Sequence, residues 1–201
     1  TAHQLGTPLS SLMGWGALLE TQNVPAAYIT ELNKDVQRLQ IITERFSKIG
    51  SAAELTEVDI RSTISESLDY VQKRISSKIH VQVQLPSRTT TVSINEALFG
   101  WVIENLVRNA ADAIGESGSI EVLVGSEAHK VIVEVKDSGK GVPKNKWKTV
   151  FKPGYTTKAR GWGLGLSLVK RIVEEYHKGH IFIKQSELGK GTTFRIELKS
   201  V

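Results

Sequence analysis

The spacing of hydrophobic residues changes near residue 50, and this change divides the chain into two parts that must fold differently. Before residue 50, apolar residues recur at alternating steps of three and four, which is the spacing of one buried stripe on an α-helix. After residue 55 the segment "KIHVQVQL" alternates with a period of two, as in a half-buried strand, while other segments keep the helical period. We therefore expect a helical N-terminal part and an α+β C-terminal part.

The helical part is predicted to be a hairpin. The segment "TQNVPAA" separates two helices, because Asn23 can cap a helix and Pro25 fits its first turn. Two helices alone bury little apolar surface, so we expect a dimer that forms a four-helix bundle. The two stripes consist of Leu5, Leu9, Leu12, Gly16 and Leu19, and of Ile29, Leu32, Val36, Leu39, Phe46 and Ile49. The expected domains are the hairpin (1–50), a linker (51–55) and a larger domain (56–201).

The larger part is predicted to be an α/β sandwich, with one sheet covered by helices. Helices are expected over 60–75, from an Asn95 cap to about Ile114, and over 164–176. Strands are expected at 79–85 and at "SIEVLVG", "KVIVEVKD", "HIFIKQ" and "TTFRIELK". Such a mixture of helices with mostly adjacent strands is typical of the α+β class.

The composition excludes several classes of protein. With 40% hydrophobic and 23% charged residues, the chain of 201 residues is not disordered, and the absence of cysteine excludes disulfides and thiolate metal sites. No apolar run approaches the roughly 20 residues of a membrane span. Eight basic residues and one acidic residue lie between Lys136 and Arg160, which favours an anionic ligand. Because few aromatic residues are interleaved with these charges, nucleic acid is not expected.

Two asparagines in "ENLVRNAADAI" are candidate ligands for a metal ion. Asn105 and Asn109 are four positions apart and therefore project from one face of the predicted helix. Amide oxygens are hard ligands that suit Mg²⁺, which in turn favours phosphate oxygens. A purely structural role for two helical asparagines is the alternative.

The segment "VKDSGKGVP" ends a predicted strand with a carboxylate and two glycines. Asp137 at the strand end can accept a hydrogen bond from an exocyclic amine such as that of adenine. Gly139 and Gly141 permit positive φ and a close approach of the backbone. The alternative is an ordinary turn with a capping aspartate.

The segment "TTKARGWGLGLSL" leads into a helix through three glycines. Gly161, Gly163 and Gly165 place backbone donors near a helix N-terminus, which favours phosphate. No strand leads directly into these glycines, so the dinucleotide-binding fingerprint is rejected. Instead, the loop with Thr157 and Lys158 is expected to close over a nucleotide, with Lys158 at a terminal phosphate.

In this order and spacing, the three motifs resemble the ATP-binding domain shared by sensor histidine kinases, DNA gyrase, the Hsp90 chaperones and MutL, over about residues 56–199. They look most like the nitrogen-sensor type of histidine kinase, in which "NLxxNAxDA" and "TTKxxGxGLGL" also occur. The resemblance implies that Asn105 and Asn109 hold Mg²⁺ and the phosphates of ATP, that Asp137 binds the adenine amine, and that Thr192 supports it through water. The implied nucleotide-binding residues are Asn105, Arg108, Asn109, Asp137, Gly139, Gly141, Thr157, Lys158, Gly161, Gly163, Gly165, Leu166 and Thr192.

Two positions depart from the pattern of the family. Trp162 stands where relatives usually carry a small residue, which puts the packing of the loop in doubt. Asp112 stands where many histidine kinases carry lysine, so Lys158 or Arg108 would have to supply the missing positive charge.

The candidate nucleophile lies at the N-terminus. "HQLGTPL" resembles the phosphoacceptor motif H-[E/D]-x-x-[T/N]-P-L of histidine kinases, which implies that His3 accepts the phosphoryl group. Gln4 replaces the acid that orients the imidazole in the family, and Thr7 matches the residue that positions water for dephosphorylation of the partner regulator. The other four histidines (His80, His129, His177 and His180) are expected to be structural or solvated.

The combined interpretation is an ATP- and Mg²⁺-dependent protein-histidine kinase that phosphorylates His3 and passes the group to an aspartate of a response-regulator receiver domain. In the gyrase and chaperone branches a glutamate base activates water, and Asn105 aligns with it here, which disfavours hydrolysis. A conformational ATPase and a pseudokinase or phosphatase module remain alternatives. The chain lacks an initiator methionine, so we expect a cytoplasmic piece of a longer protein, including the case of a membrane-bound sensor.

Overall fold

The computed structural model describes residues 54–158 and 163–201, together with residues 12, 14, 15, 17–19, 25, 28–30, 32, 33 and 36. The chain divides into two compact units, Thr1–Ala53 and Glu54–Val201. The described residues of the first unit are helical except for Pro25, whose carbonyl accepts a hydrogen bond from the backbone of Tyr28 at 2.9 Å. Most of the predicted hairpin, and residues 51–53 of the predicted linker, lie outside the described residues.

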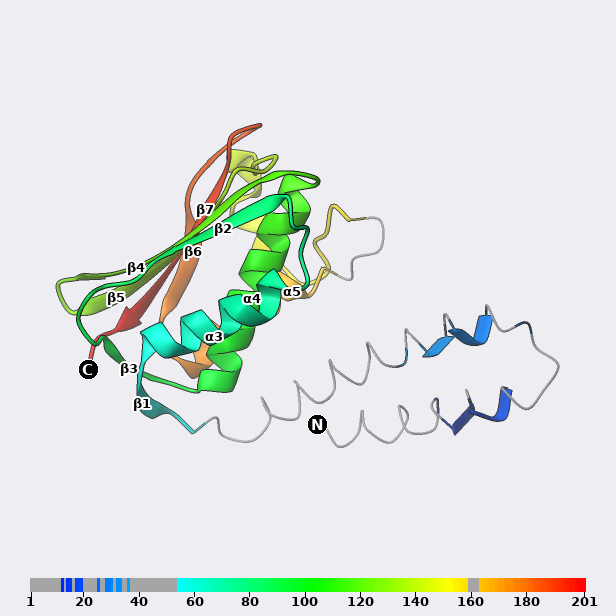
Figure 1. The fold of residues 1–201 in the computed structure, drawn as a ribbon, viewed down its shortest axis with the longest axis horizontal. Helices are drawn as coiled ribbons and strands as arrows, with labels where there is room; N and C mark the ends of the chain where they lie inside the picture. The colour runs from blue at the N-terminus through cyan, green and yellow to red at the C-terminus, as the bar shows by residue number, and fades with distance from the viewer. Residues whose placement is uncertain are drawn as a thin grey trace. The chain divides into compact units, whose positions relative to one another are not determined.

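The second unit combines two sheets with three α-helices (Figure 1). A five-stranded sheet has the order β2-β4-β5-β7-β6, in which only the β2–β4 pair is parallel, and β1 pairs with β3 in a separate antiparallel ribbon. In chain order the elements are β1 (Thr56–Asp59), α3 (Ile60–Gln72), β2 (Ile79–Gln84), β3 (Thr91–Ile94), α4 (Glu96–Ile114), β4 (Gly118–Glu127), β5 (Lys130–Asp137), two 3₁₀ turns (Lys144–Lys146 and Thr149–Phe151), α5 (Gly165–Arg171), a π-helical turn (Ile172–Tyr176), β6 (His180–Glu187) and β7 (Gly191–Lys199).

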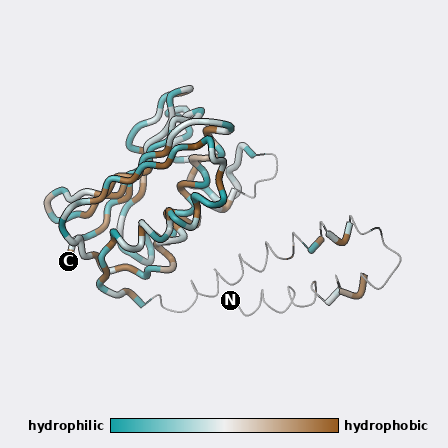
Figure 2. Tube along the Cα trace, viewed as in Figure 1, coloured by the Kyte–Doolittle hydropathy of each residue, from teal (hydrophilic) through white to brown (hydrophobic). Residues whose placement is uncertain are grey.

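The core lies between one face of the large sheet and the helices (Figures 1 and 2). Alternate residues of the central strands point toward the helices, so Val131, Val133 and Val135 of β5 are buried. Of the two positions between them, Glu134 is partly exposed, whereas Ile132 is also buried. Helix α4 contributes the largest fully buried side chain of the described residues, that of Phe99, and packs against α3 as well as the sheet. This packing fixes α4 against the sheet and so fixes the positions of both candidate asparagines.

Helix α4 begins where the sequence predicts. The Asn95 side chain accepts a hydrogen bond from the backbone of Leu98 at 3.0 Å, which satisfies one of the free N–H groups of the first turn. The backbone N–H of Asn95 itself donates to Nε2 of His177 over 3.0 Å, and Nδ1 of His177 lies 2.9 Å from the Ile172 carbonyl oxygen. Since a carbonyl only accepts, the ring is the neutral tautomer with its proton on Nδ1.

His177 predicts a loss of stability in mild acid. Burial lowers the pKa of His177 below its usual 6.5, because the charged ring would be desolvated. The unfolded chain therefore takes up a proton more readily than the folded chain, so stability is complete above about pH 6.5 and falls below it, by at most about 1.4 kcal/mol per pH unit. Thermal unfolding at pH 7.5 and pH 5.5 should show this loss in the parent and a smaller one in His177→Gln.

The matched control is His180→Gln, because the His180 side chain is 61% exposed. This variant should keep the acid sensitivity of the parent. Equal sensitivity of the parent and His177→Gln would contradict the assignment of His177 as a buried neutral ring.

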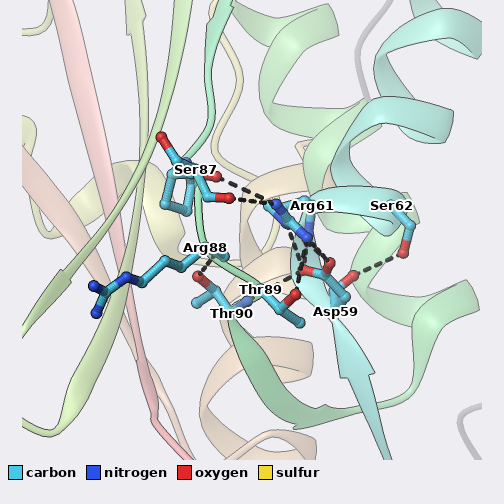
Figure 3. A network of polar contacts seen from close by, with 8 residues as sticks. Asp59, Arg61, Ser62, Ser87, Arg88, Thr89 and Thr90 are labelled. Atoms are coloured by element: carbon cyan, nitrogen blue, oxygen red, sulfur yellow. Dashed lines mark hydrogen bonds and ion pairs between the residues drawn. The ribbon is translucent and has the colours of Figure 1, made fainter.

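A polar network fastens the loop before β3 to the start of α3 (Figure 3). Asp59 caps α3 by accepting from the backbone of Arg61, and its carboxylate also binds the Arg61 guanidinium, with the Nη2–Oδ2 pair 2.6 Å apart. The same guanidinium donates to the Ser87 carbonyl oxygen at 3.2 Å and to Oγ1 of Thr89 at 3.1 Å. This bonding keeps the pKa of the Asp59 carboxyl below its usual value.

The predicted elements of the larger part are observed within a few residues of their expected ends, and the predicted sandwich is confirmed. Two features were not predicted. The ribbon of β1 and β3 was missed because each strand has only four residues, and β2 is more exposed than a half-buried strand, because it lies at an edge of the sheet.

Candidate functional site

Asn105 and Asn109 interact directly on one face of α4. Nδ2 of Asn109 donates to Oδ1 of Asn105 over 2.9 Å, which leaves Oδ1 of Asn109 free to accept from other groups. The Lys158 ammonium group donates to this oxygen over 3.0 Å and also forms an ion pair with Asp112, three positions further along the helix. The backbone at Lys158 is thereby held near the C-terminal half of α4.

The glycine-rich segment approaches the same face. A methyl group on Gly165 would lie 2.9 Å from Oδ1 of Asn105, so the lack of a side chain lets the start of α5 lie against the amide. Gly163 has φ +64°, and its carbonyl accepts a hydrogen bond from Gly154 at 3.0 Å. Helix α5 itself has only seven residues before the π-helical turn. Phosphate binding at its start stays a prediction.

Asp137 is buried at the end of β5, with 4% of its surface exposed. Its Oδ1 accepts backbone hydrogen bonds from Gly139 at 2.8 Å and Thr192 at 3.3 Å, whereas no residue in the described part of the chain donates to Oδ2. Burial raises the pKa of Asp137, and the two backbone hydrogen bonds oppose that shift. The second oxygen is thus available to a donor that enters the site.

The turn after Asp137 is packed so closely that positions 139 and 141 have no room for a side chain. A methyl group on Gly139 would lie 2.6 Å from the carbonyl carbon of Ala113 at the end of α4, and one on Gly141 would lie 2.2 Å from the Glu187 carbonyl oxygen. Gly141 also has φ +74°. The backbone of Lys140 donates to Ala113 at 3.0 Å, so this turn and the asparagine face meet at the same end of α4.

The other predicted residues lie in different surroundings. Arg108 is paired with Glu104 on its own helix (Nη2–Oε2 3.9 Å), whereas the ammonium group of Lys158 bonds to Asn109, so Lys158 supplies the charge at Asn109. Oγ1 of Thr157 accepts from Lys140 Nζ at 3.1 Å, and Leu166 is half-buried in α5. Four predicted site residues lie outside the described part: His3, Gln4, Thr7 and Gly161.

Sequence reasoning did not select Ser186, which joins the Asp137 cluster. Its hydroxyl group lies 2.9 Å from the hydroxyl of Thr192 and accepts a hydrogen bond from the Val142 backbone at 2.7 Å. Nothing local distinguishes this serine, because only the pairing of β6 with β7 places it opposite Thr192. Lys140 was also missed, since basic residues are frequent throughout this loop.

The amide oxygens of Asn105 and Asn109 on α4 are suitable ligands for a divalent cation that also binds a phosphate compound. Amide oxygens suit Mg²⁺, and Oδ1 of Asn109 already accepts a positively charged group, the ammonium of Lys158. Within residues 54–158 and 163–201 and the described part of the hairpin, no three His, Cys, Asp or Glu side chains gather at one place. A cation at Asn105 and Asn109 would therefore need oxygen ligands from its nucleotide or from water.

This combination of fold and site defines an ATP-binding α/β sandwich. Residues 94–201 match the family described as histidine kinase-, DNA gyrase B- and HSP90-like ATPase, and the chain belongs to this family. A curated relative, the sensor histidine kinase ZraS of Salmonella typhimurium, is 33% identical over 98% of this chain, which spans 44% of that protein.

Solved histidine kinases have the same fold. The catalytic domain of histidine kinase ThkA superposes with a TM-score of 0.66 at 31% identity, covering 73% of this chain and 95% of that one. Full-length ShkA in complex with AMPPNP matches with a TM-score of 0.79 at 25% identity over 100% of this chain and 44% of its own. ThkA in complex with the response regulator TrrA matches with a TM-score of 0.71 at 25% identity, covering 100% and 60%.

The likeness to sensor histidine kinases bears out the predicted ATP-binding catalytic domain of that class. None of the helices in the described part of the chain has the length and apolar character needed to cross a membrane. The individual site residues stay predictions.

Proposed function

We propose that this chain is the core of an ATP-dependent protein-histidine kinase. In this proposal the unit 54–201 binds ATP, the imidazole of His3 accepts the γ-phosphoryl group, and the group then passes to an aspartate of a response-regulator receiver domain. The observation that carries the proposal is the face of α4 on which Asn109 donates a hydrogen bond to Asn105 and accepts one from Lys158.

The chemistry of this face favours transfer to a protein group over hydrolysis. Water attack requires a general base near the γ-phosphate, and Asn105 stands where hydrolytic members of the family carry a glutamate. Amides are poor bases. The neighbouring carboxylate of Glu104 is only 19% exposed and pairs with Arg108, which draws it toward that residue.

Each part of the proposed site has a defined task. The carboxylate of Asp137 accepts a hydrogen bond from the adenine amine, with Thr192 beside it. Asn105 and Asn109 would hold Mg²⁺, which when bound neutralises phosphate charge, and Lys158 adds a positive charge to the same face. Most of the catalysis in phosphoryl transfer comes from such positioning and charge neutralisation.

The proposed phosphoacceptor segment carries two further roles. The amide oxygen of Gln4 would orient the His3 ring without the full charge of an acid, and Thr7 would position water for dephosphorylation of the regulator. Solved ThkA binds the response regulator TrrA, which supports a receiver domain as the partner. Because ATP is a substrate in this proposal, we assign this part of the protein to the cytoplasm. The assignment of Mg²⁺ rests on the amide oxygens of Asn105 and Asn109.

A homodimer through residues 1–50 belongs to the same proposal. Trp15 and Tyr28 are 62% and 71% exposed on the described helical residues, which leaves large aromatic side chains available to a second copy. A four-helix bundle would cover such side chains.

Incubation with γ-labelled ATP and Mg²⁺ tests the proposed function. The parent should take up acid-labile, base-stable label, as a phosphohistidine does. His3→Ala should take up none although it still binds ATP, because only the acceptor is missing. Asn109→Ala should take up none because nucleotide binding itself is lost.

Other outcomes would favour the remaining alternatives. Nucleotide binding without any labelled histidine in the parent would contradict kinase activity and indicate a pseudokinase or phosphatase module. Rapid release of phosphate that is undiminished in His3→Ala would indicate a conformational ATPase.

A further inference from the structure

The ammonium group of Lys158 lies between two oxygen atoms of α4. It donates to Oδ1 of Asn109 over 3.0 Å and forms an ion pair with the carboxylate of Asp112. These two residues are three positions apart and share one face of the helix. An amide oxygen and a carboxylate oxygen thus form a position for a cation, and the chain's own lysine fills it.

Asp112 places negative charge on the face where phosphates are proposed to bind. In the structure Lys158 compensates this charge, but the two side chains are 45% and 46% exposed, so their ion pair is weak and a phosphate group can replace the carboxylate as the partner of Lys158. A nucleotide that draws Lys158 toward its phosphates leaves the carboxylate uncompensated nearby. The energetic consequence depends on whether another cation arrives with the nucleotide.

We propose that Asp112 makes nucleotide binding depend on the divalent cation. The carboxylate of Asp112 repels a metal-free polyphosphate. It also holds Lys158 on Oδ1 of Asn109, which is the oxygen atom that a metal ion would need. A divalent cation on that oxygen compensates Asp112, so the repulsion is confined to the metal-free nucleotide. This inference rests on the proposed function, because it assumes that phosphates occupy the face of Asn105 and Asn109.

Calorimetric titration with ADP, in excess Mg²⁺ and in excess EDTA, tests the inference. Asp112→Asn removes one negative charge close to the phosphates, so the metal-free affinity should rise about fivefold, whereas the affinity with Mg²⁺ should change less than about twofold. The ratio of the two affinities should therefore fall about fivefold. In a Lys158→Gln background the same change should have a larger effect, because nothing else compensates the carboxylate.

The matched control is Glu121→Gln. Glu121 also pairs with a lysine, Lys136, at 3.3 Å, but it lies on β4, the second strand of the large sheet. This variant removes the same charge elsewhere and should keep the affinity ratio of the parent. Because Asp112 is half exposed, the variant should fold, which equal melting temperatures would verify.

Two results would overturn the inference while leaving the proposed function intact. An unchanged ratio in Asp112→Asn would show that the carboxylate does not distinguish the two forms of the nucleotide. A parallel fall of both affinities would show that Asp112 only positions Lys158. If the parent bound no ADP in Mg²⁺, the proposed function would itself fail, and this inference with it.

Discussion

Replacing Gly191 by alanine should destabilise the unit Glu54–Val201 by about 4 kcal/mol and abolish nucleotide binding. Gly191 has φ +116°, and an added methyl carbon would lie 1.8 Å from the backbone carbonyl oxygen of Asp137, far inside contact distance. The clash is with backbone at the junction of β5 and β7, so no side-chain rotation can relieve it. Moving the backbone of Asp137 also moves the carboxylate proposed to bind adenine.

Gly189→Ala is the matched control for this prediction. Gly189 lies two residues away in the same turn and has φ +76°, but nothing lies within 4 Å of an added methyl carbon. The cost should be limited to backbone strain of about 1 kcal/mol, with ADP affinity preserved. Denaturant unfolding measures both values, and similar losses in the two variants would show that the contact with Asp137 is not decisive.

Asp137→Asn should weaken ADP binding about a hundredfold while leaving the fold intact. Oδ1 of Asp137 already accepts from Gly139 and Thr192, so the asparagine must keep its oxygen there and present its NH₂ group at the position of Oδ2. A donor would then face the adenine amine, which is also a donor. Because burial raises the pKa of Asp137, removing the charge should not reduce stability.

Inosine nucleotides make this prediction sharper. They carry a carbonyl oxygen in place of the adenine amine, so Asp137→Asn should bind IDP at least as tightly as ADP, the reverse of the parent. Asp69→Asn, on the exposed side of α3, removes the same charge and should retain the preference for ADP. Calorimetry supplies both affinities, and an Asp137→Asn variant that still prefers ADP would disprove contact between Asp137 and the base.

The sequence by itself predicted the order of the helices and of the strands of the large sheet, and it supplied the candidate site residues. Helix α4 could be predicted because Asn95 caps it locally and its apolar residues follow the helical period. The four-residue spacing of Asn105 and Asn109 places them on one face of any helix, and a strand that ends in Asp137 followed by glycines indicates a tight turn. These are local properties, which neighbouring residues decide.

Only the tertiary structure decided which of these residues meet. The contact of Lys158 with Asn109 and Asp112 joins positions 49 and 46 residues apart, and the choice of Lys158 over Arg108 depends on the Glu104 pair that holds the arginine. Ser186 reaches Thr192 only because β6 and β7 pair in one register. The steric need for glycine at position 191 likewise arises from β5, which lies more than fifty residues earlier in the chain. Contacts of this kind depend on how the strands pair and how α4 packs on the sheet, and no local sequence pattern predicts them.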